Sequence, residues 1–429
     1  VLDLPVRPGD PLTPGRGATA GAERLPRARA ETLMKIPVLP LSSVDGEKLL
    51  RALDGAVVPD AWKGALPLTY RFGGTGKTVV RMKVELNWET VPAHNVIARL
   101  PGAEFPDEWI LRGNHYDAWV IGAQDPMSGL VAMLEEARAL AMLRDKTGWR
   151  PRRTIVFCAW DAEEQGLLGS TEWCEQNAAE LRQKVVAYIN SDNTARGFIS
   201  LAGSHSLETL AGQIAREVLD PQTGVSASDR LRASWIVNGP EDRRKLAQER
   251  ANLYLGALGS GSDYSPFLQH LGIASLNAKF GGESTGGEYH TCFDTFDHFS
   301  RFVDPGAAYG AALTKAGGRF LLRLADADIL PFDFRGSART YEIYLNEVIK
   351  LADDLRKQTT ERNRQITEGL VKLAADPQLP FVAPKLKASV PWAGPATSSA
   401  VIGSPSSSES LANTPWAAGI SSTSSSSRL

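Results

Sequence analysis

The sequence lacks any apolar run that approaches the roughly 20 residues needed to cross a bilayer, so we expect no membrane-spanning segment in it. It also lacks an excess of charge, because 47 basic residues stand against 49 acidic ones in a chain of 429 residues. Nucleic acid and anionic membranes are therefore not expected as partners. Cysteines are scarce, and the three present (Cys158, Cys174 and Cys292) have no CxxC spacing, which argues against a disulfide framework.

From about residue 94 onward, apolar strands alternate with amphipathic helices. The strands are expected at HNVIARL, EWILRGNH, RTIVFCAW, VVAYINSD and GIASLNAKF, and the helices at 128–143 (behind a Ser128 cap), 166–182, 207–219, 262–270 and 305–325. This alternation predicts an α/β domain with a mostly parallel sheet that is flanked by helices on both faces.

The remaining parts of the chain differ from this region in composition and hydrophobic pattern. Residues 1–35 are expected to be loop with room for one short helix, and 36–88 contain β-like runs such as LPLTYRF and TVVRMKVELNW. Residues 340–376 form a second helical region, which could be a bundle or a dimerisation arm. Beyond about 393 the composition is dominated by Ser, Thr, Ala, Gly and Pro, which predicts disorder.

Acidic and imidazole side chains follow three of the predicted strands at their carboxyl ends. They lie in HYDAWVIGAQDP, WDAEEQG and YINSDN, and they are His115, Asp117, Asp125, Glu163, Glu164 and Asp192. His290 follows the last predicted strand, in EYHTCFD. Since the carboxyl ends of parallel strands line one crevice, we expect these groups to meet there.

The residue types fit a di-zinc hydrolase. Zinc accepts imidazole nitrogen and carboxylate oxygen, and two zinc ions need a bridging carboxylate, a role open to Asp125. One member of the adjacent pair Glu163 and Glu164 can bind metal while the other exchanges a proton with water and the leaving amine. Asp117 is suited to accept the other N–H of His115 and hold its tautomer. Each motif alone is common on protein surfaces, and only the conjunction predicts a metal centre.

Long segments of the chain resemble one known family. These are HYDAWVIGAQDP, GWRPRRTIVFCAWDAEEQGLLGSTEW, AYINSD, LGSGSDY and YHTCFDTF. From residue 9 to about 385 the chain resembles the glutamate carboxypeptidase II family of di-zinc peptidases, which has a non-enzymatic relative in transferrin receptor. The resemblance implies a zinc exopeptidase fold, in which His115 and Asp192 bind one zinc, Glu164 and His290 bind the other, Asp125 bridges and Glu163 is the base.

The resemblance further implies a structural Ca²⁺ held by Glu172, Glu175 and main-chain oxygens of Thr13 and Arg16. Oxygen ligands suit this hard cation. On the residues alone, Glu172 and Glu175 would indicate an ordinary exposed helix face.

The resemblance also implies a domain layout. Its parts are 1–16, a loop of the peptidase domain; 17–88, part of a protease-associated β domain; 89–330, the peptidase domain; 331–392, the start of a helical dimerisation domain; and 393–429, a disordered tail. The first peptidase strands are expected to lie upstream of this chain, and the tail does not resemble the family's continuation. We therefore expect a chain that is incomplete at both ends, a homodimer, and a location outside the cytoplasm.

The positions that match the substrate-binding arginines and asparagine of glutamate-specific members are Ala202, Ser262, Asn277 and Lys279. Only Lys279 is cationic, so a strict preference for acidic dipeptides is not expected. Tyr289 matches a residue that helps to bind the substrate or the tetrahedral oxyanion, although it could equally be a packed aromatic beside a ligand.

The sequence therefore predicts a zinc-dependent exopeptidase acting on small peptides. Two alternatives stay open. An aminopeptidase could use the same metal site, because the ligands do not choose which end of the peptide is read. A receptor-like homologue would keep the fold without catalysis, although such relatives lose the ligand set that this chain keeps.

Overall fold

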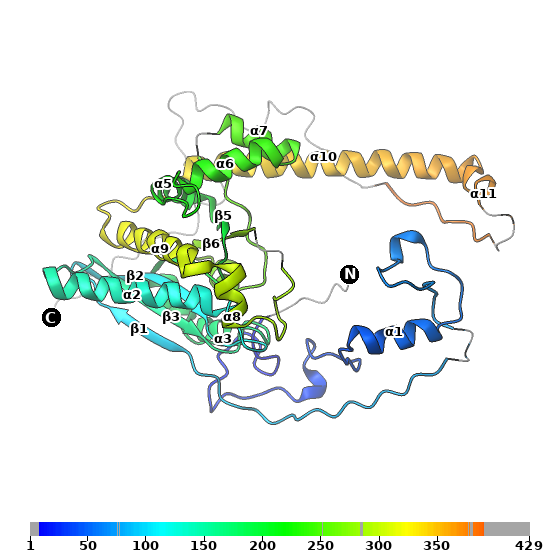
Figure 1. Cartoon of the computed structure of the whole chain (residues 1–429), viewed down its shortest axis with the longest axis horizontal. Coiled ribbons are helices and arrows are strands. Elements are labelled where there is room, and N and C mark those ends of the chain that lie inside the picture. The colour runs from blue at the N-terminus through cyan, green and yellow to red at the C-terminus, as the bar shows by residue number, and fades with distance from the viewer. Residues whose placement is uncertain are drawn as a thin grey trace, which may run out of the picture. The chain divides into compact units, whose positions relative to one another are not determined.

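The computed structural model describes residues 8–389, with gaps at 75, 77, 251, 284, 285, 376 and 378–380. The chain divides into two compact units, Val1–Ser337 and Ala338–Leu429. The first unit holds a single sheet with its helices (Figure 1). The predicted disordered tail at 393–429 lies outside the described residues.

Six strands form the sheet in the order β1-β3-β2-β4-β6-β5. Their bounds are Val96–Leu100 (β1), Phe105–His115 (β2), Arg153–Trp160 (β3), Val185–Asn190 (β4), Gly197–Gly203 (β5) and Ser275–Gly282 (β6). The inner strands β3, β2, β4 and β6 run parallel, whereas β1 and β5 are antiparallel edges. The predicted mostly parallel α/β sheet is confirmed. The edge strand β5 was not predicted, since its segment GFISLAG begins and ends in glycine, a residue depleted in strands.

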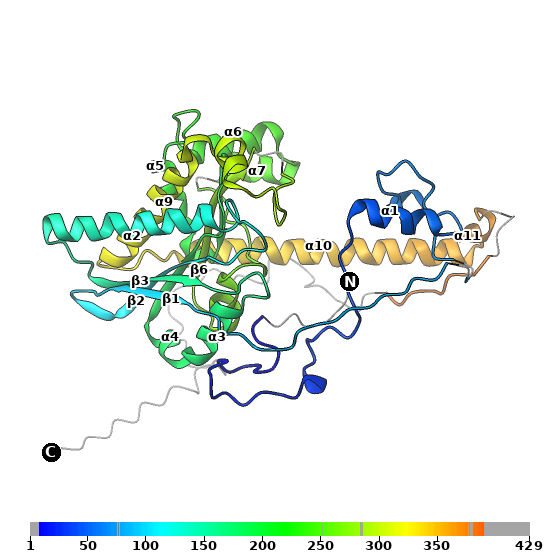
Figure 2. The same cartoon turned by 60° about the horizontal axis from the view of Figure 1, so that its bottom comes forward.

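Alternate residues of the inner strands enter two hydrophobic clusters. On β2, Ile110 belongs to one cluster and Leu111 to the other, and on β3 Ile155 and Val156 divide in the same way. Because successive strand side chains point to opposite faces, this alternation means that both faces of the sheet are buried. Helices α2 (Met127–Thr147), α5 (Glu208–Glu217) and α9 (Ala308–Asp326) supply residues to the first cluster. Helices α3 (Leu168–Gln176) and α4 (Ala178–Lys184) cover the other face (Figure 2).

Several helix boundaries differ from those predicted. Ser128 is not the cap of α2 but lies inside it, where its hydroxyl donates to the Gln124 carbonyl. The predicted helix 166–182 is broken at Asn177, whose φ of −108° and ψ of 16° leave the α region between α3 and α4. The predicted helix 262–270 is reduced to a π-helical turn at Pro266–His270.

Short helices not predicted from the sequence complete this unit. They are α1 (Ser43–Ala52), α6 (Ala227–Asn238), α7 (Glu241–Glu249), α8 (Phe296–His298), a second π-helical turn (Phe299–Val303), and 3₁₀ turns at Asp60–Trp62 and His205–Leu207. Two further 3₁₀ turns fall within predicted segments: Arg27–Arg29 within 1–35, and Pro305–Ala307 at the start of the predicted helix 305–325.

The β-like runs predicted between 36 and 88 do not form strands. Among the described residues of this range there is only an isolated bridge between Val57 and Arg71. Val79 and Leu86 of the run TVVRMKVELNW are largely exposed. A strand is stabilised by a paired neighbour, and none pairs with this run in the described part of the chain. Its assignment to a protease-associated domain stays a prediction.

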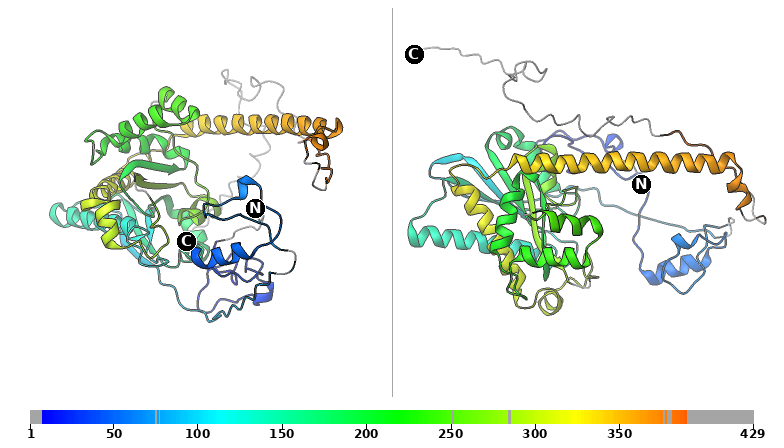
Figure 3. Two further views of the ribbon diagram at one scale, coloured as in Figure 1. Left: turned by 45° about the vertical axis from the view of Figure 1, so that its right-hand side comes forward. Right: turned by 90° about the horizontal axis from the view of Figure 1, so that it is seen from above.

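The second helical region is confirmed as one long helix, α10 (Phe334–Thr367), which begins at the end of the first unit (Figure 3). It is followed by the short helix α11 (Leu370–Leu373). In the described residues, none of the helices combines the length and the apolar character needed to cross a membrane.

Candidate metal centre

Three strands bring titratable side chains to one edge of the sheet. His115 is the last residue of β2, Glu163 and Glu164 lie in the turn after β3, and Asp192 lies just beyond β4. Asp125 precedes α2, and His290 stands in the loop after β6 with a left-handed φ of 57°. The predicted meeting of these side chains at the carboxyl edge is what the structure shows.

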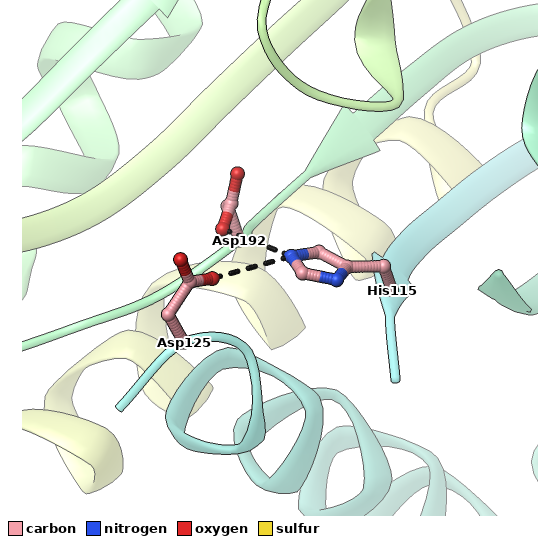
Figure 4. A group of neighbouring side chains, drawn as sticks. All are labelled: His115, Asp125 and Asp192. Atoms are coloured by element: carbon pink, nitrogen blue, oxygen red, sulfur yellow. Dashed lines mark hydrogen bonds and ion pairs between the residues drawn. The ribbon is translucent and has the colours of Figure 1, made fainter. Parts of the chain in front are cut away.

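The first group of side chains is His115, Asp125 and Asp192 (Figure 4). Nε2 of His115 lies 3.2 Å from Oδ1 of Asp192 and 3.3 Å from Oδ1 of Asp125. His115 is 1% exposed and Asp125 5% exposed, so this group is set into the protein interior. One imidazole nitrogen thus faces two carboxylates.

The second group is Asp125, Glu164 and His290. Nε2 of His290 lies 3.1 Å from Oδ2 of Asp125 and 3.2 Å from Oε2 of Glu164. The side chain of His290 is 34% exposed and its ring stacks on that of Tyr289, with centroids 3.7 Å apart. Asp125 therefore offers one oxygen to each group.

The two groups fit metal ions. Their donors are imidazole nitrogens and carboxylate oxygens, the set that zinc accepts. Among the described residues, the buried oxygens Asp125 Oδ1 and Glu164 Oε1 have no hydrogen-bond partner. Burial, and repulsion from neighbouring carboxylates, raise the pKa of both acids. A cation in each group would relieve this crowding of like charge.

The neighbouring carboxylates also change the pKa of His115. Burial by itself would lower the pKa of its imidazole, but the neighbouring carboxylates of Asp117, Asp125 and Asp192 outweigh burial and raise it. The raised pKa indicates that the electrostatic potential at the first group is strongly negative, as expected of a cation site.

Glu163 lies beside both groups without belonging to either. Its Oε2 is 4.0 Å from Nε2 of His115, and it lines a cavity of 550 Å³ together with Glu164, Tyr289 and His290. Burial, and after it the charge of Asp263, raise the pKa of Glu163 to about 9. A positive charge in the neighbouring groups would lower that pKa again.

Asp117 makes contacts beyond the predicted one between its carboxylate and His115. The imidazole Nδ1 of His115 is 3.1 Å from the main-chain carbonyl oxygen of Asp117, closer than the 3.5 Å to its carboxylate. The carboxylate also accepts the main-chain N–H groups of Glu163, at 2.9 Å, and Glu164, at 3.2 Å. Asp117 therefore fixes the tautomer of His115 through its backbone and holds the turn that carries both glutamates.

Sequence reasoning missed two acids. Asp294 accepts the main-chain N–H groups of Gln124, at 2.7 Å, and Asp125, at 3.0 Å, and so fixes the loop of the shared aspartate. Asp263 is fully buried, and neither of its oxygens has a hydrogen-bond partner in the described part of the chain. Burial above all raises its pKa to about 7, an effect that the nearby Ser170 hydroxyl opposes. Asp294 and Asp263 are the last residues of the motifs YHTCFD and GSGSD, but neither stands at a strand end.

The predicted substrate-binding residues lie on two flanks. The Asn190 amide donates to Ser262 and to Asn277, each at 3.0 Å, and Lys279 donates to Asn193 at 3.4 Å, so these side chains lie near Asp192. Tyr289 lies against His290. Ala202 pairs with Asn277 across β5 and β6.

The predicted calcium residues do meet. The Glu172 carboxylate accepts the N–H groups of Asp10, at 2.5 Å, and Ala18, at 2.6 Å, and Glu175 accepts that of Gly15 at 2.9 Å. The loop containing Thr13 and Arg16 thus wraps over α3. The main-chain oxygen of Thr13 accepts from the N–H of Arg16, at 3.2 Å, and calcium at this place stays a prediction.

A mostly parallel sheet, covered by helices on both faces and carrying such donors at its carboxyl edge, is the arrangement of the α/β zinc exopeptidase fold. Residues 95–304 match the model of peptidase family M28. The chain belongs to the glutamate carboxypeptidase II-like peptidases of this family.

Three similar proteins illustrate the range of relatives. The probable glutamate carboxypeptidase VP8 of Zea mays is 38% identical over 80% of this chain and 46% of its own length. The aminopeptidase NAALADL1 of Rattus norvegicus is 33% identical over 79% of this chain and 47% of its own. A zinc aminopeptidase structure from Bacillus subtilis covers 56% of this chain and 52% of that chain, at 20% identity and a TM-score of 0.39. The chain thus spans about half the length of the curated relatives it matches.

Proposed function

We propose that the chain is a zinc-dependent exopeptidase that hydrolyses a peptide bond near one terminus of small peptides. The observation that supports this most is the pair of side-chain groups that share Asp125, with Glu163 beside them. His115, Asp125 and Asp192 would hold one zinc ion, and Asp125, Glu164 and His290 the other. When bound, the ions would supply Lewis acidity, which lowers the pKa of water and stabilises negative charge on the substrate carbonyl.

The residues around the ions would carry out the proton transfer and the positioning. Glu163 takes the proton from the attacking water and returns it to the leaving amine. Asp117 holds the main chain of Glu163 in place through the 2.9 Å hydrogen bond. Tyr289 faces the same cavity and would donate a hydrogen bond to the carbonyl oxygen as negative charge develops there.

Replacing the base tests this proposal. Glu163→Gln should lower peptidase turnover by something on the order of 10²–10⁴, because the amide cannot accept the proton. Zinc content, measured by elemental analysis, should stay at the wild-type level. Glu135→Gln, on the exposed face of α2, is the matched control and should keep wild-type turnover. Near-normal turnover of the Glu163 variant would show that another group is the base.

An aminopeptidase is the second candidate, because one relative with 33% identity is named an aminopeptidase. Peptides with a blocked N-terminus separate the two. Cleavage of blocked peptides supports a carboxypeptidase, whereas cleavage only of peptides with a free amine supports an aminopeptidase.

A receptor-like homologue without catalysis is the third candidate. Folded wild-type protein that binds no zinc would favour it over both enzymes.

Other features remain predictions from the family resemblance: a structural Ca²⁺, a partial protease-associated domain, a homodimer, a location outside the cytoplasm and the lack of a strict preference for acidic peptides. Sedimentation tests the dimer, since a monomeric profile would count against it.

A further inference from the structure

A buried ion pair lies between β2 and α2, next to the first metal group. The guanidinium of Arg112 bonds both carboxylate oxygens of Glu136, at 2.8 Å and 3.1 Å. Arg112 and Glu136 are each 1% exposed. A charge pair this deep costs desolvation energy, which further hydrogen bonds must offset, so its remaining contacts matter.

The remaining hydrogen bonds of Arg112 connect the ion pair to the first metal group. Arg112 Nη2 also donates to the Ser191 hydroxyl at 2.8 Å, and that hydroxyl donates to Oδ1 of Asn114 at 2.6 Å. Arg112, Ser191 and Asn114 are all buried. The chain of hydrogen bonds leaves Asn114 with one defined orientation, its amide nitrogen turned away from Ser191.

The amide nitrogen of Asn114 lies close to three main-chain carbonyls. Nδ2 is 2.9 Å from the oxygen of His115, 3.2 Å from that of Asp192 and 3.4 Å from that of Pro126. His115 and Asp192 are two members of the first group, and Pro126 directly follows the third, Asp125. One side chain thus ties together the three backbones from which the first group is built.

The network is closely packed against two helices. A Cβ added to Gly129 would lie 2.4 Å from the Asp192 carbonyl oxygen and 2.5 Å from Oδ1 of Asn114. A Cβ at Gly317 of α9 would lie 2.1 Å from Oε1 of Glu136. The network is therefore enclosed at both of its ends by helix positions without side chains.

We infer that Glu136, Arg112, Ser191 and Asn114 form a positioning network that sets the affinity of the first metal group and acts on the second only through the shared Asp125. The inference rests on the proposed function. Among the described contacts, none of the hydrogen bonds of this network involves Glu164 or His290. In contrast, Asn114 contacts the main chain at or next to each member of the first group. Partners of this kind beyond the ligands typically change metal affinity about 10–100-fold when they are lost.

The test is chelator competition with Zn²⁺ on the intact chain, which reports an affinity for each of the two sites, combined with an unfolding midpoint. Ser191→Ala breaks the link between Arg112 and Asn114 with little loss of volume. Zinc affinity should fall about 10–100-fold at one site and by a clearly smaller factor at the other, which feels the change only through Asp125. The double variant Arg112→Leu/Glu136→Leu, which removes both charges together, should keep the fold and show the same unequal loss.

A second ion pair, whose acid is buried and whose arginine is partly exposed, provides the control. Arg230 bonds Asp220 at 2.6 Å in a network with Tyr309 that contains no member of either group. Arg230→Leu should lower the unfolding midpoint and leave both zinc affinities unchanged. Wild-type affinities in folded Ser191→Ala, or an equal loss at both sites, would overturn the inference. A wild-type chain that binds no zinc would instead overturn the proposed function on which it rests.

Discussion

The two halves of the metal centre differ in how firmly they are held. The first group stands at the ends of β2 and β4 and just before α2, has His115 and Asp125 buried, and has its backbones tied by Asn114. The second depends on His290, which is 34% exposed, has a φ of 57° and lies in a loop. Both share Asp125. The first half is therefore prepared in advance for a cation, whereas the second can adjust its geometry, which suits the side that meets a substrate.

Removing the shared ligand should have the largest effect. Asp125→Ala should reduce zinc from about two ions per chain to nearly none, because each group would keep only two ligands. His290→Ala, which alters only the second group, should keep about one ion. Elemental analysis after gel filtration measures both. Loss of both ions in His290→Ala would mean that the first group is not independently prepared.

Asp263 contrasts with the acids of the first group, which face the His115 imidazole, and its replacement should have the next largest effect. Its folded pKa of about 7 lies above its usual value of 3.8. The neutral acid therefore stabilises the fold fully below about pH 4, and this contribution of about 4 kcal/mol is lost as the pH rises through 7.

Asp263→Asn should remove this dependence. The metal-free variant should resemble the wild type near pH 4 and be more stable near pH 8, as unfolding midpoints across that range would show. Parallel pH profiles for the two proteins would contradict a buried, unpartnered acid at this position.

A smaller effect is expected from Gly129→Ala. The added Cβ would press on the Asp192 carbonyl and on Asn114, which should destabilise the fold by about 1–3 kcal/mol. Gly318→Ala in α9 is the matched control, since no atom lies within 4 Å of its added Cβ. That change should stabilise the chain by up to about 1 kcal/mol. Denaturant unfolding compares the two, and equal shifts would show that the space around Gly129 is less restricted than the structure indicates.

The site residues themselves could be predicted because they depend on local pattern. Apolar strands followed by His115, Glu163 or Asp192 place those side chains at one sheet edge whatever the details of packing. The supporting residues could not be found in this way. Arg112 and Glu136 pair across 24 residues, and Ser191 lies 77 residues from Asn114, so only the assembled fold brings them together.

The errors in the prediction have a similar cause. The run at 78–88 has strand-like residues, but strands depend on a neighbour that sequence pattern does not supply. Ser128 has the residue type of a helix cap, yet Pro126 occupies the N-cap position and the Ser128 hydroxyl donates back to the Gln124 carbonyl. In both cases the tertiary context decided which local structure formed.

The sharing of Asp125 also means that the two ions cannot bind independently. An ion on one oxygen changes the charge and the orientation of the carboxylate that the other ion meets. Whatever factor the first ion applies to the affinity of the second, the second must apply to the first, because the coupling free energy is reciprocal. Metal uptake by this centre is therefore a linked equilibrium, and its occupancy as a function of free zinc should not follow two independent binding curves.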